Sequence, residues 1–423
     1  MKVGIYTLGC KVNTYESEYI INILKSHNYQ VTDFNDICDI YIINTCTVTN
    51  TADIKSRKII RSARRKNKDA LIIAIGCYIE ANKDILPAEI DIAIGNKDKS
   101  KIIDLIEEYI SNKNNITRLY KDFDNFFENM YINNFENRTR AFVKIQDGCE
   151  NFCSYCIIPL VRGKCRSKKE DLIIKEITDL VNNGYTEIVL TGIHTGNYGI
   201  DIKSNFATIL NKIVKITGLK RLRISSIEIT ELTDEVLKII EENSIIVNHL
   251  HIPLQSASNK VLKLMNRKYD LNYFIKKIQE IRSLKKEISI TTDIIVGHPG
   301  EDEETFNNSL DIIKEIAFSK IHVFPYSMRK NTVSATMEQI PENLKKKHAQ
   351  TLLNLSKELE INYMKKFLNK EIEVLVETSK DGFSYGHTTN YLQVKINKQL
   401  SSNIYIKVLI NNIEYPYCIG NIR

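Results

Sequence analysis

The stretch Cys149-Glu150-Asn151-Phe152-Cys153-Ser154-Tyr155-Cys156 decides the fold of this chain, because it places three cysteines four and then three residues apart. It follows a strand-like run at residues 141–146 and therefore lies on a loop at the end of a strand. Three thiolates on one tight loop can converge on one face of a metal cluster. Structural zinc usually takes four protein ligands from paired knuckles, and no second knuckle follows here. The spacing therefore favours a 4Fe-4S cluster with one iron left open for a substrate or cofactor.

Composition sets the broad class of the protein. The chain has 423 residues, of which 43% are apolar and 26% charged, so it is long enough for two or three globular domains. It opens directly on a strand-like run, and its longest apolar run, at residues 70–79, is too short to span a bilayer. We therefore expect a cytoplasmic protein without a membrane partner, in which a content of nine cysteines favours thiolate ligands over disulfides. The net charge of +7 permits a nucleic-acid partner without requiring one.

Residues 1–115 alternate between strand-like runs and helical segments, which predicts a parallel sheet covered on both faces. The runs are 3–8, 39–44, 70–75 and 90–94. Cys10, Cys46 and Cys77 each follow the end of one of the first three runs. Because the carboxyl ends of parallel strands share one edge, these thiols should meet in space. We favour a second iron–sulfur cluster there; the alternative is three unrelated buried cysteines.

A basic helix is predicted between residues 51 and 69, with Ile54, Ile60 and Ala63 able to face inward. Its cationic face carries Arg57, Arg61, Arg64 and Arg65. Such a stripe can contact nucleic-acid phosphates in a salt-sensitive way. A solvated basic helix without a partner is the alternative.

The rest of the chain divides into a linker at 116–137, a second α/β domain at 138–366 and a small β barrel at 367–423. Six strand-like runs at 141–146, 187–190, 221–224, 250–253, 289–296 and 320–324 alternate with helices, which predicts a partial (βα)6 barrel. A long helix at 341–367 closes it. Short alternating runs after residue 371 predict the small barrel.

Several loops that follow these strands carry glycine or polar residues, which can hold the polar groups of a cofactor. We expect Tyr155, Gly192, Glu228 and Gln255 to contact it. His194, His251 and His298 lack local pairing, so we assign no metal to them. The three remaining cysteines, Cys38, Cys165 and Cys418, are interpreted as structural or incidental.

These motifs together resemble the methylthiotransferases, a family of radical S-adenosylmethionine enzymes, over nearly the whole chain. The residues that carry the resemblance are Thr7-Leu8-Gly9-Cys10-Lys11-Val12-Asn13, Glu16-Ser17, Asn44-Thr45-Cys46-Thr47-Val48, Gly76-Cys77-Tyr78, the Cys149 loop, Pro159 and Arg162-Gly163. The Lys-Val-Asn that follows Cys10 resembles the branch that acts on threonylcarbamoyladenosine at tRNA position 37. Departures from the family pattern are Ala257, His298 and Ile229, none of which removes a cluster ligand.

The resemblance implies a fold and a reaction. It implies an N-terminal cluster domain, a radical domain and a C-terminal TRAM barrel that helps to hold the tRNA anticodon stem-loop, with stacking aromatics such as Phe383, Tyr385 or Tyr391. The cluster on Cys149, Cys153 and Cys156 would bind S-adenosylmethionine and cleave it to a 5′-deoxyadenosyl radical. The cluster on Cys10, Cys46 and Cys77 would hold the sulfur that becomes the methylthio group on adenine C2. An external electron donor and a sulfur donor are implied as well.

Three alternatives remain open from the sequence. The same chemistry can act on isopentenyladenosine at position 37 or on a ribosomal-protein aspartate. An RNA-binding protein with structural zinc, in which Cys165 supplies a fourth ligand, is a third possibility. Metal analysis separates the last from the others, because two 4Fe-4S clusters contain about eight irons and absorb visible light, whereas zinc is colourless.

Overall fold

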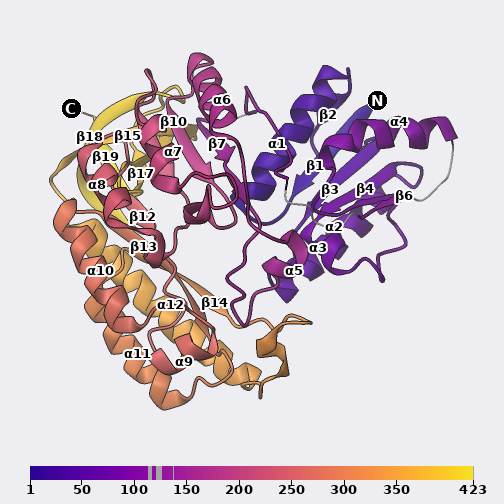
Figure 1. Cartoon of the computed structure of the whole chain (residues 1–423). Helices are drawn as coiled ribbons and strands as arrows, with labels where there is room; N and C mark the ends of the chain where they lie inside the picture. Colours follow the sequence, from indigo (N-terminus) through magenta and orange to yellow (C-terminus); the bar gives the residue numbers. More distant parts are fainter. Residues whose placement is uncertain (113–116, 121–125, 137, 423) are drawn as a thin grey trace.

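The computed structural model describes residues 1–112, 117–120, 126–136 and 138–422, and comprises an N-terminal parallel sheet, a central series of strands and helices, and a C-terminal β barrel (Figure 1). The N-terminal sheet has the order β2-β1-β3-β4-β5-β6, and all neighbouring strands are parallel. Its strands are β1 (Lys2–Thr7), β2 (Gln30–Thr32), β3 (Ile40–Thr45), β4 (Leu71–Gly76), β5 (Ile92–Ile94) and β6 (Thr117–Leu119). β6 falls in the stretch predicted as linker; it instead pairs with β5 and extends the sheet.

Helices cover both faces of this sheet, as the continuous apolar strands predict. The helices are α1 (Lys11–Ser26), α2 (Asn50–Lys66), α3 (Cys77–Ala81), the 3-10 turn η1 (Lys99–Lys101) and α4 (Ile102–Asn112). α1 and α4 pack on one face, and α2 and α3 on the other. In α2 the buried positions are Ser56, Ile60 and Ala63. Ile54 is 57% exposed, so its predicted inward orientation is wrong, because it lies out of step with that 4-then-3 spacing.

The central part contains six parallel strands in two sheets, β11-β10-β7 and β12-β13-β14. A bridge between Leu222 and Ile246 connects the two, so the strands follow one another from β7 to β14 as the partial barrel predicts. They are β7 (Arg140–Lys144), β10 (Glu187–Thr191), β11 (Arg221–Ile224), β12 (His249–His251), β13 (Ser289–Val296) and β14 (Lys320–Pro325). A short antiparallel pair, β8 (Gln146–Asp147) and β9 (Arg166–Ser167), flanks the Cys149 loop.

One large apolar core joins these strands to the helices around them. The helices are α5 (Ile158–Arg162), α6 (Glu170–Asn182), α7 (Phe206–Ile213), α8 (Asp234–Glu242), α9 (Asn259–Leu264), α10 (Leu271–Leu284), α11 (Glu303–Ile316) and α12 (Glu342–Lys365), with 3-10 turns η2 (Thr195–Asn197), η3 (Ile229–Glu231) and η4 (Val333–Thr336). No helix of the described ranges is both long and apolar enough to cross a membrane.

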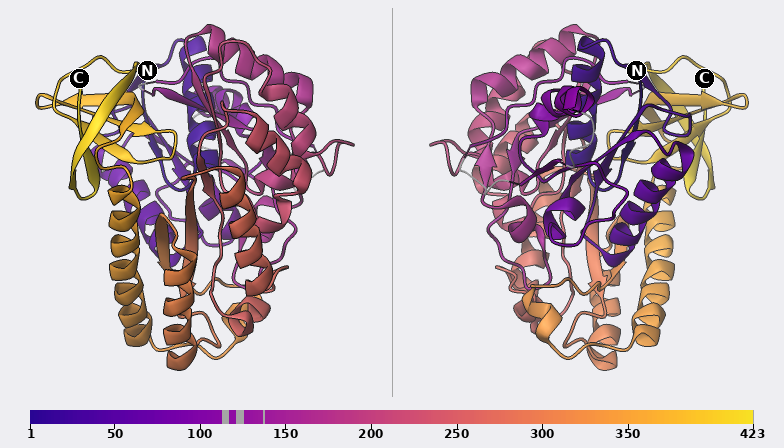
Figure 2. Two further views of the ribbon diagram at one scale, coloured as in Figure 1. Left: turned by 90° about the vertical axis from the view of Figure 1, so that its left-hand side faces the viewer. Right: turned by 90° about the vertical axis from the view of Figure 1, so that its right-hand side faces the viewer.

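The C-terminal part is a closed barrel of order β15-β16-β17-β19-β18. Its strands are β15 (Glu371–Lys380), β16 (Phe383–Thr388), β17 (Gln393–Ile396), β18 (Tyr405–Glu414) and β19 (Tyr417–Asn421). Figure 1 places this yellow barrel on the side of the molecule opposite the N-terminus, and Figure 2 shows it from two further sides. Arg221 donates to Glu373 at 2.9 Å and thus ties the barrel to the central strands. Residues of all three parts line one cavity between them.

Candidate active site

The loop at 149–156 is held in one conformation by backbone contacts. Gly148 precedes it with φ +77°, and a Cβ there would lie 1.9 Å from the carbonyl oxygen of Lys164, so only glycine fits. The N–H of Cys149 donates to the carbonyl of Gly163 at 3.0 Å, and that of Ser154 to the carbonyl of Met265 at 3.1 Å. These bonds fix the path of the loop between β8 and α5.

The thiols of this loop have polar neighbours that suit a thiolate-bound cluster. The Nη1 of Arg267 donates to the Sγ of Cys153 at 3.3 Å, and the Nδ1 of His194 lies 3.5 Å from the Sγ of Cys149. Hydrogen bonds to sulfur are one means by which proteins tune iron–sulfur clusters. Burial raises the pKa of Cys156 to about 12, so binding of a cluster would displace its proton. The donor set fits an iron–sulfur cluster.

A cavity of about 200 Å³ lies beside this loop, lined by Cys153, His194, Glu228, Arg267 and Tyr269 among others. Glu228 accepts a hydrogen bond from the Nη2 of Arg267, so a carboxylate and a guanidinium face the same space. Such a pair suits a cofactor that carries both an amino and a carboxylate group, as S-adenosylmethionine does. Glu228 is a predicted cofactor residue, and Arg267 and His194 are polar groups for which the sequence predicts no role.

The second cysteine triplet lies at the carboxyl edge of the N-terminal sheet. Cys10 is the N-cap of α1, Cys46 follows β3, and Cys77 begins α3 directly after β4. Gly9 has φ +101°, and a Cβ there would lie 3.1 Å from the Sγ of Cys46, which places that thiol beside the backbone next to Cys10. The Nδ2 of Asn96 donates to the Sγ of Cys77 at 3.4 Å. Cys77 and Cys10 are both close enough to Cys46 to raise the pKa of its thiol by their charge, so the three cysteines lie near one another at this edge.

Burial raises the pKa of Cys46 to about 12 and also raises the pKa of Cys10, while the nearby charge of Arg162 opposes both shifts. Arg162 belongs to α5, directly after the other cysteine loop, and donates to the Oδ1 of Asn13 at 2.8 Å. One guanidinium thus reaches from the central part to the N-terminal triplet. Arg162 stands in a motif that carries the family resemblance, but no sequence pattern predicts this contact.

A buried ion cluster surrounds Arg162. Its Nη1 lies 3.1 Å from the Oε1 of Glu16 and 3.0 Å from the Oδ1 of Asp147. Glu16 also pairs with the Nζ of Lys99 at 2.5 Å and with the Nζ of Lys144 at 3.0 Å. Each of these side chains is at most 6% exposed. The cluster joins α1 to β7, β8 and α5, and so fixes the two cysteine triplets relative to each other.

A second cavity, of about 720 Å³, opens between the three parts of the molecule. The N-terminal part contributes Cys10 and Lys11, the central strands Gly192 and Arg223, and the β barrel Tyr391. The volume is in the range of ligand pockets. Cys10 lies on its wall, so a ligand bound in this cavity is next to the N-terminal triplet.

Of the other three predicted cofactor residues, one lines a cavity and two do not. Gly192 lines the larger cavity, and a Cβ there would lie 3.0 Å from the Oε1 of Gln146. Tyr155 and Gln255 line neither cavity. The ring of Tyr155 packs edge-on against His298, with 6.2 Å between ring centroids. Gln255 has φ +68° and joins β13 through its backbone.

The predicted RNA-binding arginines of α2 differ in their surroundings. Arg61 and Arg65 are exposed, and Arg57 is half-buried with its guanidinium 6.0 Å from the ring centroid of Tyr78. Arg64 instead binds Asp91 at 2.6 Å and the carbonyl oxygens of residues 68, 70 and 89. Its guanidinium thus hydrogen-bonds to the protein at the sheet edge, and its predicted contact with RNA stays a prediction.

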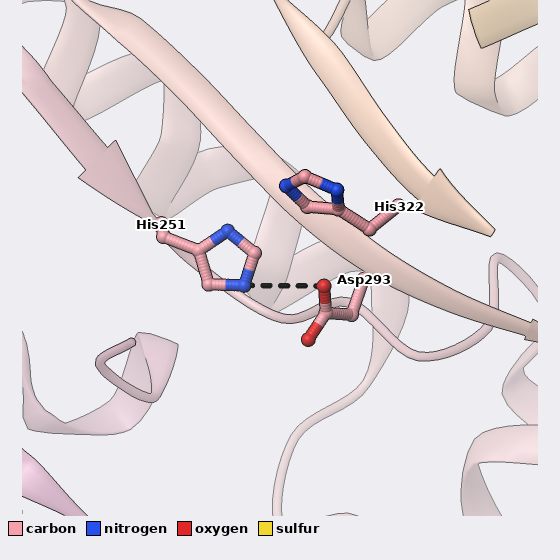
Figure 3. Close-up of side chains that lie close together, drawn as sticks. All are labelled: His251, Asp293 and His322. Atoms are coloured by element: carbon pink, nitrogen blue, oxygen red, sulfur yellow. Dashed lines mark ion pairs between the residues drawn. The ribbon is translucent and has the colours of Figure 1, made fainter. Parts of the chain in front are cut away.

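Three side chains that line the larger cavity lie close together and form a further polar group (Figure 3). His251, Asp293 and His322 end or occupy β12, β13 and β14, and their ligand atoms all lie within 4.8 Å of one another. The sequence assigns no metal to His251, yet imidazole and carboxylate together can hold a divalent cation. In this arrangement the two ring nitrogens of His251 face Thr291 at 2.9 Å and Asp293 at 3.2 Å. His251 thus contacts both Thr291 and Asp293 where all three line the cavity.

Comparisons with known proteins agree with this geometry. Residues 143–313 match the Radical SAM superfamily, and residues 2–95 match a family described as Uncharacterized protein family UPF0004. A Bacillus subtilis protein named threonylcarbamoyladenosine tRNA methylthiotransferase MtaB is 43% identical over 98% of this chain and 95% of its own length. A Clostridium botulinum protein named tRNA-2-methylthio-N(6)-dimethylallyladenosine synthase is 35% identical over 89% of this chain and 86% of its own.

Among solved structures, the chain resembles the radical S-adenosylmethionine methyltransferase TsrM from Kitasatospora setae. The TM-score is 0.59 at 13% identity, covering 79% of this chain and 77% of the other. At an identity this low, the similarity supports a shared fold and no shared function. The strand-and-helix framework around the Cys149 loop is thus one that other radical enzymes share.

Proposed function

Because the chain belongs to the radical S-adenosylmethionine tRNA methylthiotransferases, we propose that it adds a methylthio group to C2 of N6-threonylcarbamoyladenosine at position 37 of tRNA. The observation that carries this proposal is the 43% identity to the Bacillus subtilis protein of that name over 98% of the chain. A second candidate substrate is the dimethylallyl form of the same adenosine, because the Clostridium botulinum relative is named for it.

The enzymes of this family use S-adenosylmethionine and two 4Fe-4S clusters, which supply the radical chemistry that an unactivated aromatic C–H bond requires and the sulfur that is transferred. We assign one cluster to Cys149, Cys153 and Cys156. The other is assigned to Cys10, Cys46 and Cys77.

The protein's own side chains would position the reactants. Arg267 and Glu228 face the smaller cavity and are suited to the charged groups of the cofactor. The larger cavity would receive adenosine 37, unstacked from the anticodon loop, with its C2 directed toward Cys10. The exposed arginines Arg61 and Arg65, with Arg57, would contact phosphates of the stem-loop.

Three further partners follow from this reaction. Reductive cleavage needs an external electron donor, and repeated turnover needs a sulfur donor. The substrate is a tRNA, which supports a cytoplasmic location.

The proposal is tested by mass spectrometry of tRNA nucleosides from cells with and without this protein. We expect methylthio-threonylcarbamoyladenosine only when the protein is present. Detection of methylthio-isopentenyladenosine instead would support the proposed reaction and overturn the proposed substrate. No change in any nucleoside would overturn the tRNA assignment and favour the ribosomal protein.

The cluster assignment has its own test. Cys149→Ala should abolish formation of 5′-deoxyadenosine and reduce the iron content from about eight to about four atoms per chain. Cys38→Ala, a buried cysteine outside both triplets, is the matched control and should keep both values. Continued formation of 5′-deoxyadenosine by the Cys149 variant would show that the loop is wrongly assigned.

A further inference from the structure

The wall of the larger cavity next to Cys10 carries three cationic side chains from distant parts of the chain. Lys11 is the first residue of α1, Arg140 the first of β7, and Arg223 lies in β11. All three line the cavity together with Tyr391 of the β barrel. This is a concentration of positive charge inside a cavity, where a counter-charge has more effect than it has at the open surface.

The two arginines already have acidic partners. Arg223 donates through Nε to the Oε1 of Glu187 at 2.5 Å, and Arg140 pairs with the Oε1 of Glu377 at 3.2 Å. Lys11 differs from both. Within the described ranges, its ammonium group has no side-chain hydrogen bond and no acidic partner. The cavity therefore holds one positive charge that the protein itself does not balance.

The surroundings of Lys11 are consistent with an uncompensated cation. Burial would raise the pKa of the Tyr391 hydroxyl, but Arg140, Lys11 and Arg223 together lower it. The field at this wall thus favours an anion.

The position of Tyr391 is fixed by its neighbours. Its ring stacks against those of His249 and His387, with 4.7 Å between centroids in each case. The guanidinium of Arg223 lies 4.9 Å from the centre of the same ring. The hydroxyl is therefore held among the cations, where it can donate a hydrogen bond to a bound anion.

The chemistry of the candidate substrates identifies such an anion. A threonylcarbamoyl group on N6 carries a free carboxylate, whereas a dimethylallyl group is a hydrocarbon. Positions 2 and 6 of adenine flank the same ring nitrogen, so a group on N6 lies close to C2. If C2 faces the cluster that includes Cys10, the N6 group falls near the adjacent residue, Lys11.

We propose that Lys11, supported by Arg140 and the hydroxyl of Tyr391, binds the carboxylate of the threonylcarbamoyl group and so selects this adenosine over those without a carboxylate. This inference rests on the proposed function and adds to it the subsite that reads the substrate. Lys11 is thus a specificity-determining residue, and it contacts the substrate away from the reacting carbon.

The test uses anticodon stem-loop RNAs that differ only at position 37. One carries threonylcarbamoyladenosine, one its carboxylate methyl ester, and one unmodified adenosine. Their equilibrium binding to the cluster-loaded full chain is measured by fluorescence anisotropy under anaerobic conditions. We expect the free carboxylate to bind more tightly than the ester, and Lys11→Met to reduce that ratio on the order of tenfold, because a charge-assisted hydrogen bond is lost.

Two further variants separate charge from fold. Tyr391→Phe keeps the stacked ring, removes only the hydroxyl, and should reduce the same ratio by a smaller factor. Lys58→Met removes an exposed lysine of α2 and should leave the ratio unchanged, because phosphates are common to all three RNAs. Iron content and visible absorption equal to wild type show that each variant has folded around its clusters.

The outcomes distinguish this inference from the proposed function. If wild type prefers the free carboxylate and Lys11→Met keeps the full preference, the carboxylate is read elsewhere and the inference is wrong, while the proposed function stands. If wild type binds the three RNAs equally, both the inference and the substrate assignment fail. Loss of the preference in Lys11→Met, with a smaller reduction in Tyr391→Phe and none in Lys58→Met, supports the inference.

Discussion

Replacing Glu16 with glutamine removes one negative charge from the buried ion cluster that joins α1 to the central strands. Glutamine keeps the size of the side chain and one acceptor oxygen. It leaves Lys144 and Arg162 with Asp147 as an acidic partner, and Lys99 with a hydrogen bond to the Oδ1 of Asn96 at 3.2 Å. Breaking one partner out of a buried ion pair costs about 3–5 kcal/mol, because the remaining charges stay buried without compensation. We expect a loss of this size in the free energy of unfolding at pH 7.

The pH dependence of this loss has a definite sign. Burial alone would raise the pKa of Glu16, but Arg162, Lys99 and Lys144 hold it well below its ordinary value of 4.5. The carboxylate therefore contributes its full stability above pH 4.5, and that contribution falls as the pH drops toward the lower folded value. Linkage gives a reduction of about 0.2 kcal/mol at pH 5 and about 0.8 kcal/mol at pH 4. The cost of Glu16→Gln should shrink by these amounts.

The measurement is guanidinium unfolding of the cluster-free protein at pH 7, 5 and 4, followed by circular dichroism and tyrosine fluorescence. Coincident transitions from the two probes justify a single free energy. Glu18→Gln on the same helix is the control, because its partner Arg138 is 42% exposed and burial raises the pKa of Glu18. That variant should cost less than about 1 kcal/mol. Equal effects of the two substitutions at pH 7 would refute the role assigned to the buried cluster.

Two other predictions concern α2 and a buried histidine. The double variant Arg61→Gln with Arg65→Gln should reduce the slope of log K against log salt concentration for tRNA binding by about 1.8, at 0.9 for each phosphate contact. Arg64→Gln should leave this slope unchanged and lower the thermal stability. A change of slope in the Arg64 variant would contradict the structural role of that residue. Burial lowers the pKa of His298 to about 4, so between pH 6.5 and 4 the unfolded chain binds a proton more readily than the folded chain. The free energy of unfolding should therefore decrease as the pH is lowered through this range, by up to about 1.4 kcal/mol per pH unit. His298→Phe should lose this dependence in unfolding experiments across that range; a variant with the wild-type pH profile would show that His298 is not the group responsible.

The sequence predicts the sheet framework well because its signals are local. Each of the six central strands contains apolar residues and lies between helical segments, and the structure places each within one or two residues of the predicted range. β2 and β6 have only three residues each, too few to show a pattern of alternation. β6 forms by pairing with the edge of β5. That edge exists only once the sheet has folded, so the sequence of β6 by itself does not predict the strand.

The two cysteine triplets that we assign to clusters stand out in the sequence for two different reasons. Cys149, Cys153 and Cys156 are close in sequence, and Cys10, Cys46 and Cys77 share a strand edge through a general rule of parallel sheets. The contact of Arg162 with Asn13 joins residues 149 positions apart, and no periodicity reports it. The contacts of Arg64 with backbone carbonyl groups are not predictable either, because spacing along a helix shows which residues share a face but not which carbonyl groups lie beneath them.

The larger cavity has an evolutionary consequence. Its walls come from the start of α1, the central strands and the loop that carries Tyr391, so no one of the three parts encloses a substrate alone. Exchanging the β barrel or the N-terminal part for that of a relative with another preferred nucleoside would therefore give a chimaera with a mismatched cavity. A change of substrate preference can therefore involve residues from three distant stretches of the gene, because all three form the walls of one cavity.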